Sequence, residues 1–152
     1  MRTIRRVFAL LCVVLAITLI TGSATMASQT KTISMVKNCA TWPTTSTCIV
    51  TRAAPLRFLR GSVITYHDPS NLGNPVGTDV TIATIATNST APGHCRFDWT
   101  AQPPAGLCTF TSGTGRLAGF QATLAVAYIG GADFSLRGSY SFDRSQGDDP
   151  RD

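Results

Sequence analysis

Residues 134–142 alternate between large apolar side chains and small or polar ones. The even positions carry Phe, Leu, Gly, Tyr and Phe, whereas the odd positions carry Ser, Arg, Ser and Ser. Successive side chains of a β-strand point to opposite faces, whereas a helical face repeats every 3.6 residues. The alternation therefore excludes a helix here and predicts a strand with one buried face.

Shorter β-prone runs precede this segment, and turn sequences rich in Gly and Pro separate them. No run shows the 3.6-residue period of an amphipathic helix. Seven or eight short strands at this spacing predict an all-β fold, either an antiparallel barrel or a sandwich. The predicted strands cover residues 33–36, 49–51, 56–66 (with Gly61 as a bulge), 79–87, 94–101, 107–112, 119–129 and 134–142.

The composition favours strands as well. The chain has 22 Thr, no Glu and only two Lys, and charged residues make up 14% of it. Glu and Lys are good helix formers, whereas Thr favours strands. With 43% hydrophobic residues, the middle of the chain is too apolar to be disordered.

The first 27 residues have the pattern of a secretory signal peptide. Arg2, Arg5 and Arg6 precede an apolar run over residues 7–20, and small residues follow up to residue 27. Cleavage is predicted after Ala24 or Ala27, which predicts a secreted, extracellular protein. The alternative, a retained membrane anchor, needs about 20 apolar residues, and Thr and Ser dilute the run after residue 20. Membrane contact is therefore expected only through the leader before cleavage.

The predicted organisation of the chain follows from these boundaries. Residues 1–27 are the signal peptide, 28–48 an extended N-terminal arm, 49–143 the barrel domain and 144–152 a disordered polar tail. Removing the leader takes three arginines from a formal net charge of +5. A nucleic-acid-binding protein needs a concentrated basic face, so no nucleic-acid partner is expected.

Four cysteines remain after the leader is removed, and they allow three disulfide pairings. Locality favours Cys39 with Cys48 and Cys95 with Cys108, which closes two short loops. A zinc site is the alternative, but Cys-x8-Cys and Cys-x12-Cys lack the close pairs of structural zinc sites. We therefore predict two disulfides, no metal and an oxidising compartment.

The stretch CTFTSGTGRLAGFQA, residues 108–122, together with the final Tyr-Ser-Phe at 140–142, resembles the allene oxide cyclase and dirigent superfamily of β-barrels. The stretch VITYHDP at 63–69 and the Gly-Asn-Pro at 73–75 are similar to the His-Asp strand end and Asn-Pro loop of plant dirigent proteins. The resemblance covers about residues 56–142. It implies a calycin-like eight-stranded barrel whose apolar lumen holds a reactive small molecule.

The resemblance also implies roles for particular residues. Asp68 matches the dirigent pocket aspartate and is the weak catalytic candidate. Gln121 stands where dirigent proteins carry a pocket arginine, and Ala118 stands where cyclases carry a glutamate. Gly113 and Gly115 match a glycine turn that is structural, because glycine takes positive φ without strain.

The predicted inward faces supply an aromatic ligand pocket but no His, Lys or Glu. Gly113-x-Gly115-x-x-Ala118 formally matches a dinucleotide fingerprint, but a strand follows it where a helix is needed, so no cofactor is expected. The predicted pocket residues are Phe97, Trp99, Tyr128, Phe134, Tyr140 and Gln121.

Three functions follow as hypotheses. The first is an exported barrel that binds a small apolar or aromatic ligand without catalysis. The second is a dirigent-like or cyclase-like catalyst of small-molecule coupling or cyclisation, an isomerase-type activity. The third is a secreted interaction protein that acts through its loops. General acid–base catalysis needs a proton-transfer group within reach of the ligand, and the predicted lumen offers none, which favours the first hypothesis.

Overall fold

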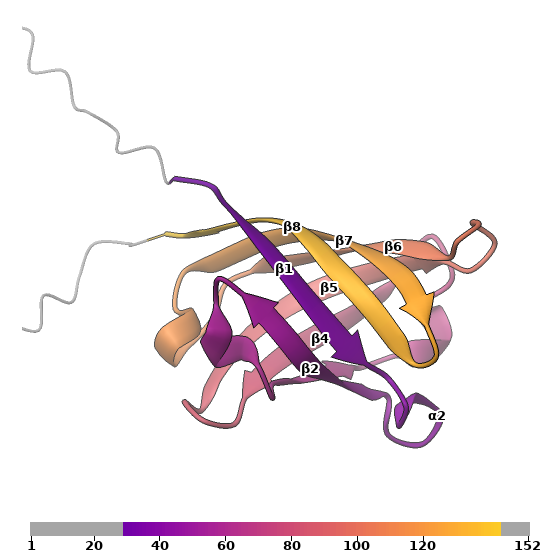
Figure 1. Ribbon diagram of the computed structural model, residues 1–152, viewed down its shortest axis with the longest axis horizontal. Helices are drawn as coiled ribbons and strands as arrows, with labels where there is room; N and C mark the ends of the chain where they lie inside the picture. Colours follow the sequence, from indigo (N-terminus) through magenta and orange to yellow (C-terminus); the bar gives the residue numbers. More distant parts are fainter. Residues whose placement is uncertain (1–28, 144–152) are drawn as a thin grey trace, which may run out of the picture.

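The computed structural model describes residues 29–143 and contains one closed barrel of eight strands (Figure 1). Each strand pairs antiparallel with its neighbour in sequence, and the last pairs with the first. The predicted all-β antiparallel barrel is therefore confirmed. The strands are β1 Lys31–Asn38, β2 Thr47–Ala54, β3 Val63–Tyr66, β4 Thr78–Thr84, β5 Ser89–Asp98, β6 Ala105–Thr111, β7 Phe120–Gly130 and β8 Asp133–Phe142.

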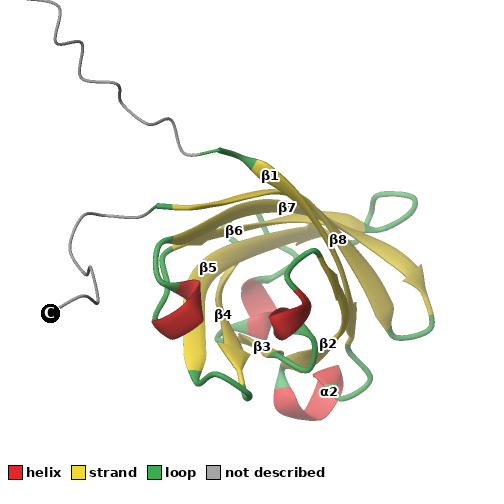
Figure 2. Cartoon of the chain, turned by 60° about the vertical axis from the view of Figure 1, so that its left-hand side comes forward, coloured by secondary structure: helices red, strands yellow, loops and turns green. Residues whose placement is uncertain are grey.

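Four short helical segments lie in the connections between strands. One α-helical turn, α2 (Trp42–Thr45), precedes β2, and three 3-10 turns follow at η1 (Arg57–Leu59), η2 (Pro69–Asn71) and η3 (Gly115–Leu117). Figure 2 shows the sheet curling round to close on itself, with α2 outside the strands. The predicted signal peptide and the predicted tail lie outside the described residues.

The barrel begins earlier than the sequence predicts. Residues 28–48 are predicted as an arm with one edge strand, but β1 runs over Lys31–Asn38 and pairs with both β2 and β8. Its inward side chains are Ile33, Met35 and Lys37, and all three are buried. The arm prediction is wrong because the unpaired edges of β2 and β8 need a partner strand, and this segment supplies it.

The predicted long strand over residues 56–66 is also shorter in the structure. Only Val63–Tyr66 forms β3, and the residues before it form η1 and a turn. Gly61 has φ +83° and its backbone N–H donates to the Val50 carbonyl at 2.8 Å. A left-handed glycine ends the regular ladder, so the β-prone residues before it fold as a connection between β2 and β3.

The turn between β6 and β7 depends on its two glycines. Gly115 has φ +57°, and a Cβ there would lie 2.5 Å from Ser89 Oγ. At Gly113 a Cβ would lie 2.1 Å from the Leu117 carbonyl oxygen. The turn therefore has positive φ at Gly115 and close backbone approach at Gly113.

Large side chains fill one end of the barrel. Phe110 and Phe120 are 1% and 0% exposed, and their ring centroids lie 6.3 Å apart. Tyr140 packs 6.3 Å from Phe120 by ring centroid, and Leu117 of η3 is fully buried. Because aromatic rings occupy the lumen at this end, any internal space must lie towards the other end, where β1, β3 and β5 finish.

Candidate functional site

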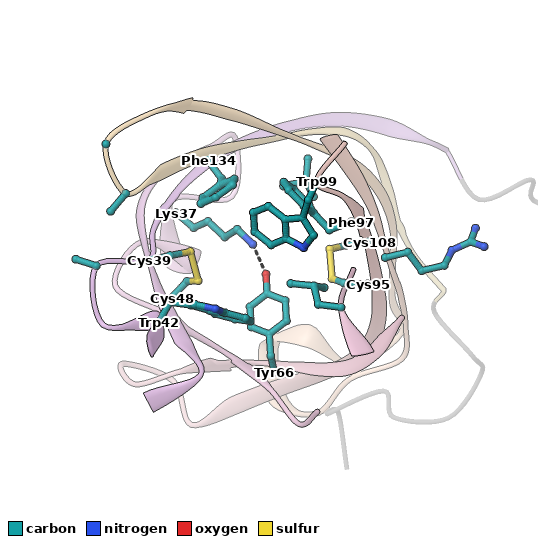
Figure 3. A pocket seen from close by; sticks show the side chains of 16 residues that line it. Lys37, Cys39, Trp42, Cys48, Tyr66, Cys95, Phe97, Trp99, Cys108 and Phe134 are labelled. Atoms are coloured by element: carbon teal, nitrogen blue, oxygen red, sulfur yellow. Dashed lines mark hydrogen bonds between the residues drawn. A yellow bond between two sulfur atoms is a disulfide. The ribbon is translucent and has the colours of Figure 1, made fainter. Parts of the chain in front are cut away.

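The opposite end of the barrel holds a cavity of about 270 Å³ (Figure 3). Many of its lining residues lie at the ends of β1, β3 and β5 and at the starts of β2 and β8. The loop that carries α2 contributes further side chains. The lining residues are Lys37, Cys39, Ala40, Trp42, Cys48, Tyr66, Leu72, Cys95, Arg96, Phe97, Trp99, Cys108, Val126, Gly131, Ala132 and Phe134.

Five aromatic side chains contribute to the wall. Phe97 packs against Trp99 with ring centroids 4.3 Å apart, and against Phe134 at 5.6 Å. On the other side Trp42 meets Tyr66 edge to face, with centroids 4.7 Å apart. Rings in such offset and edge-to-face contacts form a stable surface for a further apolar or aromatic group.

Two polar groups meet inside this aromatic wall. The Lys37 Nζ donates a hydrogen bond to the Tyr66 hydroxyl oxygen, and Figure 3 shows the two side chains pointing at each other across the cavity. Lys37 is 5% and Tyr66 3% exposed. The Nζ also lies 4.7 Å from the Tyr66 ring centroid and 5.4 Å from that of Phe134.

Burial controls the ionisation of both groups. It lowers the pKa of Lys37 to about 7, because the charged ammonium loses its hydration. It raises the pKa of Tyr66, because the phenolate is the charged form. Among the described residues no carboxylate lines the cavity, and the other basic residue of its lining, Arg96, has an exposed side chain. Near neutral pH the cavity therefore holds a large fraction of uncharged amine beside a neutral phenol.

Both disulfides lie in the cavity wall. Cys39 bonds to Cys48 and Cys95 bonds to Cys108, as locality predicts. Cys95 and Cys108 are directly opposite each other on β5 and β6, with Cα atoms 4.1 Å apart. In Figure 3 the two bridges lie on opposite sides of the Lys37–Tyr66 pair. The first bridge ties the end of β1 and the loop carrying Trp42 to the start of β2.

The aromatic residues predicted to line a pocket divide into three groups. Phe97, Trp99 and Phe134 line the cavity. Tyr128 is 39% exposed and lies outside the lining, although its ring centroid is 5.5 Å from that of Phe134. Tyr140 faces inward but packs against Phe120 in the filled end. Strand alternation gives the face that a side chain occupies but not its height along the barrel.

The two polar residues predicted from the family resemblance lie elsewhere. Gln121 is exposed and points out of the barrel, because its neighbours Phe120 and Ala122 are buried. Its Nε2 donates a hydrogen bond to the Asp143 carboxylate. Asp68 is exposed, and its carboxylate accepts 2.5 Å hydrogen bonds from Ser70 Oγ and Asn71 Nδ2 within the turn at η2. The structure places neither residue in the lining of this cavity.

The residues that give the cavity its chemistry are not among the predicted pocket residues. Lys37 and Trp42 fall in the segment predicted as an arm, and Tyr66 is the last residue of a predicted strand. A signal for Lys37 was present, because Ile33, Met35 and Lys37 follow the period-two pattern of a buried strand face.

A second polar cluster lies on the outer surface of β4 and β5. The His94 Nδ1 pairs with Asp79 Oδ1 at 2.9 Å, and its Nε2 lies 2.7 Å from the Val76 carbonyl oxygen. The hydrogen bond to Asp79 raises the pKa of His94. Within residues 29–143 no group of three or more His, Cys, Asp or Glu side chains is arranged to hold a metal ion.

Comparisons of the chain with protein-family models, with curated proteins and with solved structures found no match. Among the helices of the described part of the chain, none has the length and apolar character needed to cross a membrane.

Proposed function

We propose that this protein is an exported binding protein for a small aromatic or apolar molecule, held in the cavity at the open end of the barrel. The observation that carries the proposal is a group of four aromatic side chains around one buried polar pair: Phe97 is buried, Trp42 and Phe134 are partly buried, and Trp99 is exposed. Binding sites for small molecules typically combine an apolar lining with a few polar groups that fix orientation.

The size of the cavity limits the ligand. At about 270 Å³ it lies at the small end of ligand-binding cavities, which span roughly 300–1,000 Å³. We therefore expect a ligand built on a single ring or a short branched chain.

The polar pair sets the chemistry at the inner end of the ligand. Within residues 29–143, the side chains of Lys37 and Tyr66 hydrogen-bond only to each other, and both carry N–H or O–H donors. A ligand that buried an oxygen acceptor beside them would gain a hydrogen bond, whereas a wholly apolar ligand would leave the pair as it is. We expect the ligand to carry one carbonyl, ether or hydroxyl oxygen.

Export is part of the same proposal. Both disulfides are closed, and disulfides persist mainly in oxidising compartments outside the cytosol. The signal-peptide pattern of residues 1–27 supports the same location.

Intrinsic fluorescence tests the binding proposal directly. The chain has two tryptophans, and both Trp42 and Trp99 line the cavity. Titration with 4-methoxybenzyl alcohol should therefore change tryptophan emission in a saturable way, without chemical turnover. A sugar alcohol such as sorbitol should give no saturable change, because it cannot replace its hydration in an aromatic cavity.

Paired variants locate the binding. Val126 is 2% exposed and lines the cavity, whereas Ala125, its neighbour on β7, is exposed. Val126→Phe should weaken binding by about tenfold or more, equivalent to roughly 1.4 kcal/mol, and Ala125→Phe should not. Asp68→Ala should change binding by less than about 1 kcal/mol. Equal effects of the two β7 substitutions, in folded variants, would refute binding inside the barrel.

A further inference from the structure

The amine of Lys37 is a buried nucleophile that simple binding does not use. Lysine amines form Schiff bases with carbonyl compounds when an apolar site holds them uncharged. The cavity meets that condition, because burial lowers the pKa of Lys37 to about 7 and no carboxylate of residues 29–143 lines the wall. The other lysine of the chain, Lys31, lies exposed at the start of β1.

The surroundings of the amine fit a reaction with a carbonyl group. The Nζ lies within the cavity and is bonded to the Tyr66 hydroxyl, which places an O–H group beside any atom that the nitrogen attacks. The Tyr66 and Phe134 rings flank the nitrogen. Little water fits beside an apolar ligand in this volume, and exclusion of water favours the dehydration that imine formation requires.

We propose that Lys37 captures a small aromatic aldehyde as a reversible Schiff base inside the cavity, with Tyr66 relaying the proton. The proposal rests on the binding function proposed above and adds the chemical class of the ligand. An aldehyde fits better than a ketone, because one side of its carbonyl carbon carries only hydrogen and the amine is enclosed.

The reaction needs no partner beyond amine and aldehyde. The nitrogen lone pair bonds to the carbonyl carbon, and the carbonyl oxygen takes up the proton that the nitrogen releases. The Tyr66 hydroxyl then passes its proton to the hydroxyl of this carbinolamine as the C–O bond breaks, water leaves, and the nitrogen lone pair forms C=N. In the same step the Tyr66 oxygen takes up the remaining N–H proton, so no phenolate accumulates in the cavity. Amine and aldehyde thus give imine and water, with no change in oxidation state.

Trapping the imine tests this step. The protein with both disulfides formed is mixed with 4-methoxybenzaldehyde. Sodium cyanoborohydride then reduces any imine to a stable amine, and peptide mapping locates the adduct. The expected result is one dominant adduct at Lys37. Adducts at Lys31 or at the amino terminus in equal yield would overturn the proposal, because exposed amines would then react as well as the enclosed one.

Variants separate the roles of the two side chains. Lys37→Met should abolish the dominant adduct, and Lys31→Arg should leave it unchanged. Tyr66→Phe should slow trapping by roughly 100-fold, the usual size of a general acid–base contribution, while 4-methoxybenzyl alcohol still binds. An unchanged trapping rate in Tyr66→Phe would overturn the proton relay.

The alcohol distinguishes failure of this inference from failure of the binding function. It has the same ring and methoxy group as the aldehyde but cannot form an imine. If the alcohol quenches tryptophan emission and no Lys37 adduct forms, the Schiff-base inference is wrong and the binding function stands. If neither compound binds and no adduct forms, both proposals fail for this ligand class.

Discussion

Lys37 contributes to the dependence of the molecule's stability on pH. The unfolded chain holds the Lys37 proton up to its ordinary pKa of 10.5, whereas the folded chain loses it at about 7. Between these values the unfolded state binds more protons, so the free energy of unfolding rises with pH. The slope attributable to this one group is at most about 1.4 kcal/mol per pH unit.

Urea unfolding at pH 7, 8 and 9 should show this rise. Above about pH 10 the raised pKa of Tyr66 acts in the opposite direction, because the unfolded tyrosine then loses a proton that the folded one keeps. Lys37→Met should remove the rise between pH 7 and 9. The slopes are the proper comparison, since the substitution also removes the hydrogen bond to Tyr66. An equal slope in both proteins would contradict the assignment.

Among the elements, the turn from β6 to β7 offers a test of backbone strain against steric overlap. Gly115 and Gly131 have similar φ values, +57° and +61°, but only Gly115 has a neighbour within 4 Å of an added Cβ. Gly131→Val should lower the free energy of unfolding by about 1–3 kcal/mol, because valine is strained at a positive φ. Gly115→Val should cost more, because its Cβ meets Ser89. Thermal unfolding compares the two, and equal losses would show that Ser89 moves aside freely.

The two disulfides join elements in different ways and should differ in their effect on binding. Each closes a short loop, so replacing either pair by alanine should cost roughly 2–3 kcal/mol of stability. The ladder between β5 and β6 holds Cys95 opposite Cys108 in any case. Cys39–Cys48 instead anchors the loop that carries Trp42. Fluorescence titration should show weaker alcohol binding only when Cys39–Cys48 is removed; equal affinities in both variants would contradict this.

The elements also show what the sequence can predict. In β8, inward side chains at every second residue, five in all, allow only one assignment of the buried face. In β1 the same period is present in Ile33, Met35 and Lys37. Because lysine is rarely buried, Lys37 was not expected on an inward face, and the pattern was not recognised as a barrel strand. Gln121 was assigned to the pocket by resemblance to a family pattern. The burial of Phe120 and Ala122 on either side of it shows that its side chain points outward.

At the scale of the whole molecule, the strand pattern predicted an antiparallel barrel or sandwich and the family resemblance implied the barrel, but the open end could not be predicted. Short turns between successive strands predict neighbouring antiparallel pairs. Whether the lumen is filled depends on the summed volumes of side chains from all eight strands at each height. Phe110, Phe120 and Tyr140 meet at one end, and no local pattern in the sequence shows that they converge.

The pairing of β1 with β8 has a consequence for how the chain matures. Lys31 lies opposite Tyr140 and Asn38 lies opposite Asp133, so this ladder joins the two ends of the described chain. Translation delivers β1 first and β8 last, and contacts between such distant segments form slowly. Lys37 on β1 and Phe134 on β8 share the cavity wall, so the binding site comes into existence only when the final strand is in place. A ligand that recognises this wall stabilises completed molecules alone.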